Sequence, residues 1–246
     1  MKTQVAIIGA GPSGLLLGHL LKQAGVDCVI VERQARDYVL GRIRAGVLET
    51  VTTSLMTNLG IDKRMYAEGL IEEGFNLATN DSVIRIDIAA LTGLRVTVYG
   101  QTELTRDLMD AAPERDLPIV FEAQDVAIHE IEGDAPFVTY VKDGATQRID
   151  AAFVAGCDGF HGPSRKAIPG SAAREYEREY PFGWLGILAD VPPCHDELIY
   201  ANTDRGFALA SMRSATRSRY YIQVPLTARV EEWSEERLWG ELAARF

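Results

Sequence analysis

Gln4-Val5-Ala6-Ile7-Ile8-Gly9-Ala10-Gly11-Pro12-Ser13-Gly14 is the stretch of this sequence that decides the fold. The apolar run 4–8 predicts a short strand buried on both faces, and the glycine-rich residues 9–14 predict a tight turn. A helix over 15–24 and a second buried strand over 26–31 follow. Strand, helix and strand together form a βαβ unit of the kind that binds nucleotide phosphates.

The glycines of this turn have distinct physical roles in a dinucleotide site. Gly9 permits the turn, Gly11 lets the backbone approach a pyrophosphate, and Gly14 lets the helix pack on the strand. Ser13 adds a hydroxyl donor at a helix N-terminus that favours anions. Glu32 closes the second strand at the spacing where an acid takes ribose hydroxyls. The fingerprint alone leaves FAD and NAD as equal possibilities.

Composition limits the partners of the chain. The 246 residues carry a net charge of −10, which argues against non-specific binding to nucleic acids or anionic membranes. The three cysteines are scattered and predict reduced thiols in a cytoplasmic protein without a metal site. The apolar run 15–21 is too short to span a membrane. Arg33, Arg36, Arg42 and Arg44 form a basic cluster, either an anion site or a solvated loop face.

The rest of the chain predicts further elements. Helical spacing of apolar residues covers 48–59, and Thr102 is expected to cap a helix over 103–112. Short strands are predicted at 137–141, 147–149 and 153–155. A second layer, mostly antiparallel, is predicted from strands at 184–188, 198–201, 207–209 and 220–224. Ser234 should cap a last helix, with Trp233 and Leu238 as a hydrophobic staple.

Cys157-Asp158-Gly159-Phe160-His161-Gly162-Pro163-Ser164-Arg165 follows the buried strand at 153–155. A turn at this position presents polar groups at the carboxyl end of a strand, where open α/β sheets bind ligands. We therefore expect Asp158 to lie beside the glycine-rich turn.

Residues 211–221, Ser-Met-Arg-Ser-Ala-Thr-Arg-Ser-Arg-Tyr-Tyr, suggest a substrate site. Residues two apart share a face of an extended strand, so Ser211 and Arg213 should point together, as should Arg219 and Tyr221. An arginine with serine and tyrosine hydroxyls can clamp a carboxylate, and Tyr200 could bind a phenolate. This set suits a para-hydroxylated benzoate. The alternative is an exposed sheet face with cross-strand Arg–Tyr pairs.

The chain resembles the single-component FAD-dependent aromatic hydroxylases through Glu32-Arg33-Gln34, Tyr38, residues 42–47, Tyr99-Gly100-Gln101 and the Asp158-Gly159 segment. The resemblance implies a mixed α/β fold, with an FAD-binding Rossmann-like βαβ domain over 1–179 and a substrate-binding β-sheet domain over 180–246. It also implies FAD as cofactor and NADPH as reductant. The FAD contacts it implies are Gly9, Gly11, Ser13, Gly14, Glu32, Arg33, Arg42, Ile43, Arg44, Ala45, Gly46, Val47, Gln101 and Asp158. The NADPH contacts are Arg33, Gln34, Tyr38, Arg42, Arg44, His161 and Arg165. The substrate contacts are Tyr200, Ser211, Met212, Arg213 and Tyr221, with Tyr200 and Arg219 as catalytic residues.

The implied reaction is hydroxylation of 4-hydroxybenzoate to 3,4-dihydroxybenzoate with NADPH and O2, in a cytoplasmic homodimer. The chain is expected to lack the family's C-terminal part, and Glu72 stands where the type member has a histidine, which predicts a shifted pH optimum. Two other readings stay open. One is a reductase or halogenase of the same fold, and the other is a truncated nucleotide-binding module without catalysis.

Overall fold

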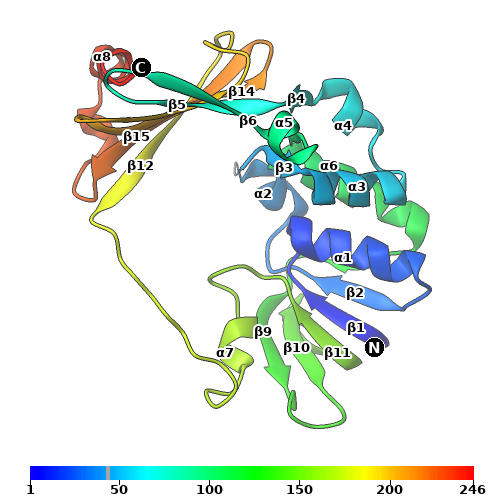
Figure 1. The fold of residues 1–246 in the computed structure, drawn as a ribbon. Helices are drawn as coiled ribbons and strands as arrows, with labels where there is room; N and C mark the ends of the chain where they lie inside the picture. The colour runs from blue at the N-terminus through cyan, green and yellow to red at the C-terminus, as the bar shows by residue number, and fades with distance from the viewer. Residues whose placement is uncertain (43–44) are drawn as a thin grey trace. The chain divides into compact units, whose positions relative to one another are not determined.

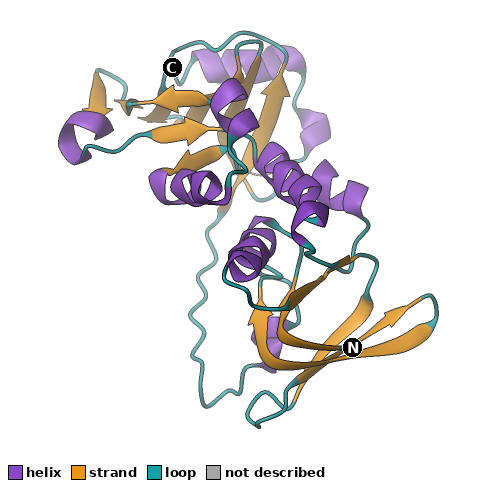
Figure 2. Ribbon diagram, turned by 90° about the vertical axis from the view of Figure 1, so that its right-hand side faces the viewer, coloured by secondary structure: helices purple, strands orange, loops and turns teal. Residues whose placement is uncertain are grey.

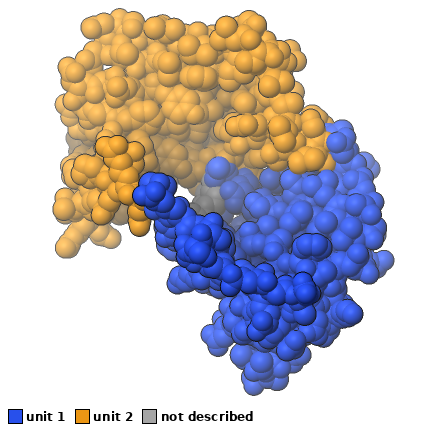
Figure 3. Space-filling model, turned by 60° about the horizontal axis from the view of Figure 1, so that its bottom comes forward, with its two compact units in different colours: residues 1–45, 56–63, 101–176 blue, residues 46–55, 64–100, 177–246 orange. Residues whose placement is uncertain are grey.

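The computed structural model describes residues 1–42 and 45–246, and Figure 1 traces them from the N-terminus to the C-terminus. They divide into two compact units, which Figure 3 colours separately. The first unit comprises residues 1–45, 56–63 and 101–176, and the second comprises 46–55, 64–100 and 177–246. Each unit therefore combines stretches that are distant in the sequence. That one unit binds FAD and the other the substrate stays a prediction.

The first unit is built on a six-stranded sheet with the order β8-β2-β1-β11-β10-β9. β1 (Lys2–Ile8) runs parallel to β2 (Cys28–Val31) on one side and to β11 (Ala145–Gly156) on the other. α1 (Pro12–Gln23) connects β1 to β2 and lies along these strands (Figure 1). The other strands are β8 (Ile119–Val120), β9 (Gln124–His129) and β10 (Phe137–Lys142). The predicted βαβ unit and fold class are confirmed.

Among the helices of the first unit, α1 and α7 (Ser164–Ala167) contact strands of this sheet, and further helices pack on α1 and on one another. These further helices include α2 (Arg36–Gly41), α6 (Gln101–Ala111) and the 3-10 helix η1 (Pro113–Arg115). The fully buried His19 of α1 contacts α6, because its Nε2 lies 2.7 Å from the carbonyl oxygen of Leu108. Burial lowers the pKa of His19, so a neutral ring makes this contact.

Three predicted boundaries differ in the structure. The strands predicted at 147–149 and 153–155 are one twelve-residue strand, β11, which pairs first with β10 and then with β1. Helix α6 begins at Gln101, so Thr102 lies inside the first turn and is not its cap. Residues 47–49 form strand β3 (Val47–Glu49), and α3 (Thr50–Leu59) begins after it. Sheet pairing outweighed the local helical spacing there.

The second unit holds a six-stranded sheet with the order β12-β15-β14-β13-β5-β6. All neighbours are antiparallel except β13 and β5, which agrees with the predicted, mostly antiparallel layer. These strands are β5 (Gly74–Ala78), β6 (Val83–Asp87), β12 (Phe182–Ala189), β13 (Leu198–Thr203), β14 (Gly206–Ser214) and β15 (Arg217–Pro225). A smaller sheet joins β3 to β7 (Val96–Val98) and β4 (Leu70–Glu72).

One face of the six-stranded sheet is covered by the last helix, and the opposite face carries Tyr200, Ser211 and Tyr221 of the predicted substrate residues. α8 (Glu235–Ala243) packs Leu242 with Tyr220 and Ile222 in an apolar cluster. Ser234 accepts a hydrogen bond from the Arg237 N–H at 3.2 Å, which confirms the predicted cap. The remaining helices are α4 (Lys63–Glu68), α5 (Ile88–Thr92) and the 3-10 helix η2 (Val230–Glu232).

Residues 173–180 lie between α7 and β12 without regular secondary structure, and all of them are exposed. Figure 2 shows this long segment in teal. Within the part of the chain that the structure describes, no helix is long and apolar enough to cross a membrane.

Candidate functional site

Gly9 lies where the carboxyl ends of three strands meet. Its N–H donates to the Val31 carbonyl at 2.8 Å, and the Cys157 N–H donates to the Ile8 carbonyl at 2.8 Å. Gly9 has φ +103, and a Cβ added there would lie 2.5 Å from the Cys157 carbonyl oxygen. A side chain at this position would meet both backbone strain and overlap. The turn therefore requires glycine to bring the segment 157–165 beside the fingerprint.

The N-terminus of α1 opens beside this turn. Gly11 is the N-cap residue and makes no side-chain cap, and Pro12 follows at the first helical position. The N–H groups of Ser13 and Gly14 have no partner inside a helix at these positions. The first turn also lacks acidic residues. This end can therefore receive an anion from a ligand.

Glu32 connects the glycine turn to the residues that follow β2. One carboxylate oxygen accepts the Ala10 N–H at 2.9 Å, and the other accepts the Gln34 N–H at 2.8 Å. A carboxylate has about four acceptor positions, so capacity for ribose hydroxyls remains. Glu32 therefore orders the turn and stays available to a ligand.

A cavity of about 640 Å³ lies over this turn in the first unit. Its lining contains Gly9, Gly11, Pro12, Ser13, Glu32, Arg33, Gln34, Tyr38, Val39, Arg42, Gln101, Thr105, Cys157, Asp158, Gly159, Phe160 and His161. A second cavity of about 340 Å³ shares Gly9, Glu32, Arg33, Asp158 and His161 with it and adds Lys166 and the β9 residues 124–126. The two cavities adjoin, and together they offer the extended space that a dinucleotide needs.

Most residues expected to contact nucleotides meet at this cavity, and a few do not. Gly14 is buried inside α1, and Ala45 accepts the Gln101 N–H at 3.0 Å. Gly46 and Val47 belong to the second unit. Ile43 and Arg44 lie outside the described residues.

The basic cluster separates into paired and unpaired side chains. Arg36 forms an ion pair with Asp110 at 2.5 Å and does not line the cavity. Arg33 and Arg42 line it, and neither has a carboxylate partner within ranges 1–42 and 45–246. Arg42 donates to the Tyr38 hydroxyl at 3.5 Å. Guanidinium groups without a carboxylate partner at a cavity are suited to phosphate. That these two arginines form an anion site stays a prediction.

Six lining residues were not among the predicted contacts: Pro12, Val39, Thr105, Cys157, Gly159 and Phe160. Thr105 follows Gln101 by one helical turn, and its hydroxyl donates to the Gln101 carbonyl at 2.7 Å. Cys157 and Phe160 stand inside the segment already singled out. The i,i+4 spacing would have identified Thr105 once Gln101 was chosen.

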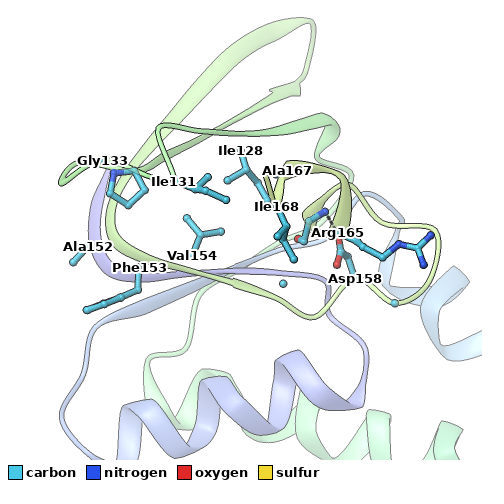
Figure 4. Close-up of a pocket in the computed structure, with 14 residues that line it drawn as sticks. Ile128, Ile131, Gly133, Ala152, Phe153, Val154, Asp158, Arg165, Ala167 and Ile168 are labelled. Carbon is cyan, nitrogen blue, oxygen red and sulfur yellow. Dashed lines mark hydrogen bonds between the residues drawn. The ribbon is translucent and has the colours of Figure 1, made fainter. Parts of the chain in front are cut away.

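Arg165 lies at a different cavity, of about 660 Å³, between β11, the turn after β9 and α7. In Figure 4, Ile131, Val154 and Ile168 gather in this cavity, and Asp158 and Arg165 lie toward one end. Arg165 forms an ion pair with Glu175 at 3.1 Å, and its guanidinium lies 4.4 Å from the centre of the Phe160 ring. Asp158 and Gly159 line both this cavity and the cavity over the glycine turn.

In the second unit, the sheet aligns two predicted substrate residues in one row. Gly186 pairs with Tyr221, Tyr221 with Leu209, and Leu209 with Tyr200 across four neighbouring strands. Directly opposed residues place their side chains on the same face. Ser211 stands two residues beyond Leu209 and shares that face.

Arg213 is the unpaired residue of a β-bulge, because the β14–β15 register shifts between Met212 and Ser214. Bulges often redirect a side chain beside a functional site. Burial lowers the Arg213 pKa to about 10, and the charge of Arg219 contributes a smaller effect in the same direction. The electrostatic effect of Tyr221 raises the Arg213 pKa. Among the described residues, Arg213 has no ion pair or hydrogen bond. A half-buried cation without a partner is a strong indication of an anionic ligand.

Tyr200 packs against aromatic neighbours, and its pKa responds to the charge of a buried acid. Its ring lies 5.5 Å from Phe75 and 6.1 Å from Phe207, measured between ring centres. Burial, with a smaller effect from the charge of Glu72, raises the Tyr200 pKa.

Glu72 is 2% exposed, and neither of its carboxylate oxygens has a hydrogen-bond partner in the described chain. Burial raises the Glu72 pKa to about 7, despite the opposing effect of the Leu198 backbone.

The remaining substrate candidates lie on different faces. Met212 pairs with Ser218 and is buried on the face opposite to Tyr221. Arg219 lies on the Tyr221 side, with its guanidinium carbon 4.5 Å from the centre of the Tyr221 ring. The face toward Tyr200 therefore gathers Ser211, Arg219 and Tyr221, with Arg213 beside them.

Comparison with known proteins matches residues 2–246 to the model of one family, described as FAD binding domain. The chain is 53% identical over 246 residues to a p-hydroxybenzoate hydroxylase of Acinetobacter baylyi, covering 100% of this chain and 61% of that protein. It is 26% identical over 169 residues to a pentachlorophenol 4-monooxygenase of Sphingobium chlorophenolicum, covering 67% of this chain and 31% of that protein. The chain thus spans less than two thirds of the length of these relatives.

Solved structures agree with the fold. PqsL of Pseudomonas aeruginosa in complex with 2-aminobenzoylacetate has a TM-score of 0.78 at 17% identity, over 92% of this chain and 61% of that one. The flavin-dependent halogenase CmlS has a TM-score of 0.77 at 21% identity, over 100% of this chain and 46% of that one. At this level of identity the likeness shows the fold alone, and a shared fold does not specify a reaction.

Proposed function

The chain belongs to the FAD binding domain family, and from this premise we propose that it is the FAD- and substrate-binding part of a flavoprotein aromatic hydroxylase acting on 4-hydroxybenzoate. The observation that carries the substrate proposal is Arg213, a half-buried cation without an internal partner beside Ser211, Tyr221 and Tyr200. The name of the 53% identical relative, p-hydroxybenzoate hydroxylase, supports the same substrate.

The cavity residues fit a bound FAD. The glycine turn at Gly9 leaves no side chain between the strands and the ligand, and the α1 N-terminus offers free N–H groups to a pyrophosphate. Glu32 would accept ribose hydroxyls, while Arg42 and Gln101 would contact the cofactor. Arg44 and Ile43, outside the described residues, are proposed as further contacts.

The second unit is proposed to bind the aromatic acid. Arg213 would hold the carboxylate, and the hydroxyls of Ser211 and Tyr221 would donate to it. A ligand without the carboxylate would leave Arg213 buried and unpaired, which opposes its binding. The alternative is an exposed sheet face with cross-strand Arg–Tyr pairs. It is less well supported, because Arg213 is half-buried and makes no cross-strand pair.

The protein's own residues would prepare the ring for attack. Tyr200, whose raised pKa keeps it protonated, would donate a hydrogen bond to the substrate phenolate. This contact stabilises the charge that makes the neighbouring ring carbon nucleophilic. Bound FAD supplies electron acceptance from the reductant and activation of O2. Arg219 is proposed to orient flavin and substrate, and Glu72 to exchange the phenol proton, which a pH–rate profile tests.

NADPH is the proposed reductant. Arg33, Gln34, Tyr38, Arg42 and His161 line one cavity, and its two arginines, which have no carboxylate partner in the described chain, suit a 2′-phosphate. Arg44 and Arg165 are proposed as additional contacts. We also propose a cytoplasmic homodimer, in keeping with the family resemblance.

The proposal is tested by mixing the purified protein with FAD and NADPH and following NADPH absorbance with and without 4-hydroxybenzoate. We expect stimulation by the substrate and formation of 3,4-dihydroxybenzoate. Flavin binding without product would favour a binding module that needs further polypeptide for catalysis. Substrate-independent oxidation of NADPH would favour a reductase of the same fold.

A further inference from the structure

We propose that Gly46 is a specificity-determining residue, because its missing side chain leaves the space that the Arg213 guanidinium occupies. This inference rests on the proposed function, in which Arg213 binds the substrate carboxylate. It gives Gly46 a role toward the substrate that differs from the cofactor contact expected from the sequence.

The two residues meet inside the second unit. A Cβ atom added to Gly46 would overlap Nη1 of Arg213, with the guanidinium carbon 2.6 Å and Nη2 3.4 Å away. Carbon atoms of real side chains do not approach other heavy atoms to 2.6 Å without displacement. The guanidinium therefore lies directly against the Gly46 backbone.

The backbone of Gly46 has little freedom to move away. Its carbonyl accepts the Tyr99 N–H at 2.9 Å, and the next residue, Val47, pairs with Val98 in the β3–β7 ladder. Arg213 stands on a bulge of the other sheet and reaches Gly46 with the far end of a flexible side chain. A methyl group at Gly46 would thus displace the guanidinium and leave both backbones in place.

Because the Gly46 backbone is held and the Arg213 side chain is flexible, a substitution at Gly46 should affect ligand binding and not folding. Gly46→Ala should fold normally, because Arg213 can rotate into other rotamers. The displaced guanidinium would no longer present its planar fork to a carboxylate, and bidentate recognition depends on that geometry. The loss should appear only for ligands that carry the carboxylate.

The experiment is a double-mutant cycle of Gly46→Ala and Arg213→Ala in the FAD-loaded protein. Binding of 4-hydroxybenzoate and of its neutral counterpart 4-hydroxybenzyl alcohol is measured by calorimetric titration. We expect Gly46→Ala to weaken 4-hydroxybenzoate binding about 10- to 100-fold, as for loss of a charged hydrogen bond. It should leave the alcohol unaffected and add nothing to Arg213→Ala.

The control is Gly240→Ala, since a Cβ at that position meets no atom within 4 Å. It should change neither ligand's affinity. Melting temperatures and FAD dissociation constants are measured for all variants. If Gly46→Ala alone folds poorly, the double variant tests the cause, because Arg213→Ala removes the guanidinium that the added methyl group would overlap.

Three results would overturn the inference. Gly46→Ala could weaken both ligands equally, or weaken 4-hydroxybenzoate binding equally in the presence and absence of Arg213→Ala. It could also lower the affinity for FAD enough to account for the weaker ligand binding. If Arg213→Ala weakens 4-hydroxybenzoate binding and Gly46→Ala does not, the inference alone fails. If Arg213→Ala has no effect, the proposed carboxylate site fails, and the inference fails with it.

Discussion

Glu72 and Arg213 are ionisable side chains of the second unit whose pKa values burial moves in opposite directions. Burial disfavours the charged form of each, so the pKa of Glu72 rises to about 7 and that of Arg213 falls to about 10. Arg213 still carries its charge at neutral pH and therefore needs an anion. Glu72 titrates within the physiological range, and its neutral form is the one that the buried site favours.

Glu72→Gln should make the stability of the protein less dependent on pH. Between the ordinary glutamate pKa of 4.5 and the raised value of about 7, the folded chain binds more protons than the unfolded chain. Stability therefore falls as pH rises through this window and reaches a penalty of about 3 kcal/mol above it. Glutamine keeps the shape without the charge.

The measurement is urea unfolding of both proteins from pH 4 to pH 8.5. We expect similar free energies of unfolding at the acid end and a growing advantage of Glu72→Gln toward the alkaline end. A difference that stays constant across this range would show that Glu72 does not titrate as its burial implies.

At the scale of elements, the Ser234 cap followed local chemistry, whereas the predicted Thr102 cap did not form and strand extent followed pairing. The Ser234 cap of α8 formed as its sequence indicates, with the Arg237 N–H as donor. β11 continued through two predicted strands because β10 and β1 pair with successive halves of it. The bulge at Arg213 arises from the register between β14 and β15, which strand periodicity cannot reveal.

Ser234→Ala should lower the free energy of unfolding by about 1 kcal/mol, the usual cost of losing an N-cap. The alanine variant leaves the first-turn N–H groups of α8 without a side-chain acceptor. Urea unfolding measures the change, and Ser234→Asp serves as the control because aspartate can also cap. If alanine and aspartate variants are equally destabilised, the cap does not stabilise this helix.

At the scale of the whole molecule, the chain passes between its two units more than once, and the last passage is the exposed segment 173–180. Each residue of this segment lies outside regular secondary structure. Arg174 and Arg178 offer two trypsin sites within it. Exposed irregular segments are the preferred sites of proteolytic cleavage.

Limited trypsin digestion should therefore cut first after Arg174 and Arg178, giving two major fragments identifiable by mass spectrometry. The double variant Arg174→Gln, Arg178→Gln should resist this early cleavage while unfolding at the same urea concentration. Early cleavage at other sites in the parent protein would mean that segment 173–180 is better protected than its exposure indicates.

The sequence by itself determined the βαβ turn, the family resemblance, the acid at Glu32 and the cap at Ser234. These features depend on residues that are close together in the chain, so the local backbone geometry can be predicted from their spacing. The sequence also predicted that Ser211, Tyr221 and Tyr200 act together, although only the strand register shows that they share one face of the sheet.

Only the tertiary structure decided how distant segments meet. It placed Met212 on the opposite face, paired Arg36 with Asp110, separated Arg165 from the nucleotide cavity and brought Gly46 against Arg213. It also buried Glu72 without a partner. Burial and contact between sheets depend on the packing of the whole chain, which no local pattern of residues encodes.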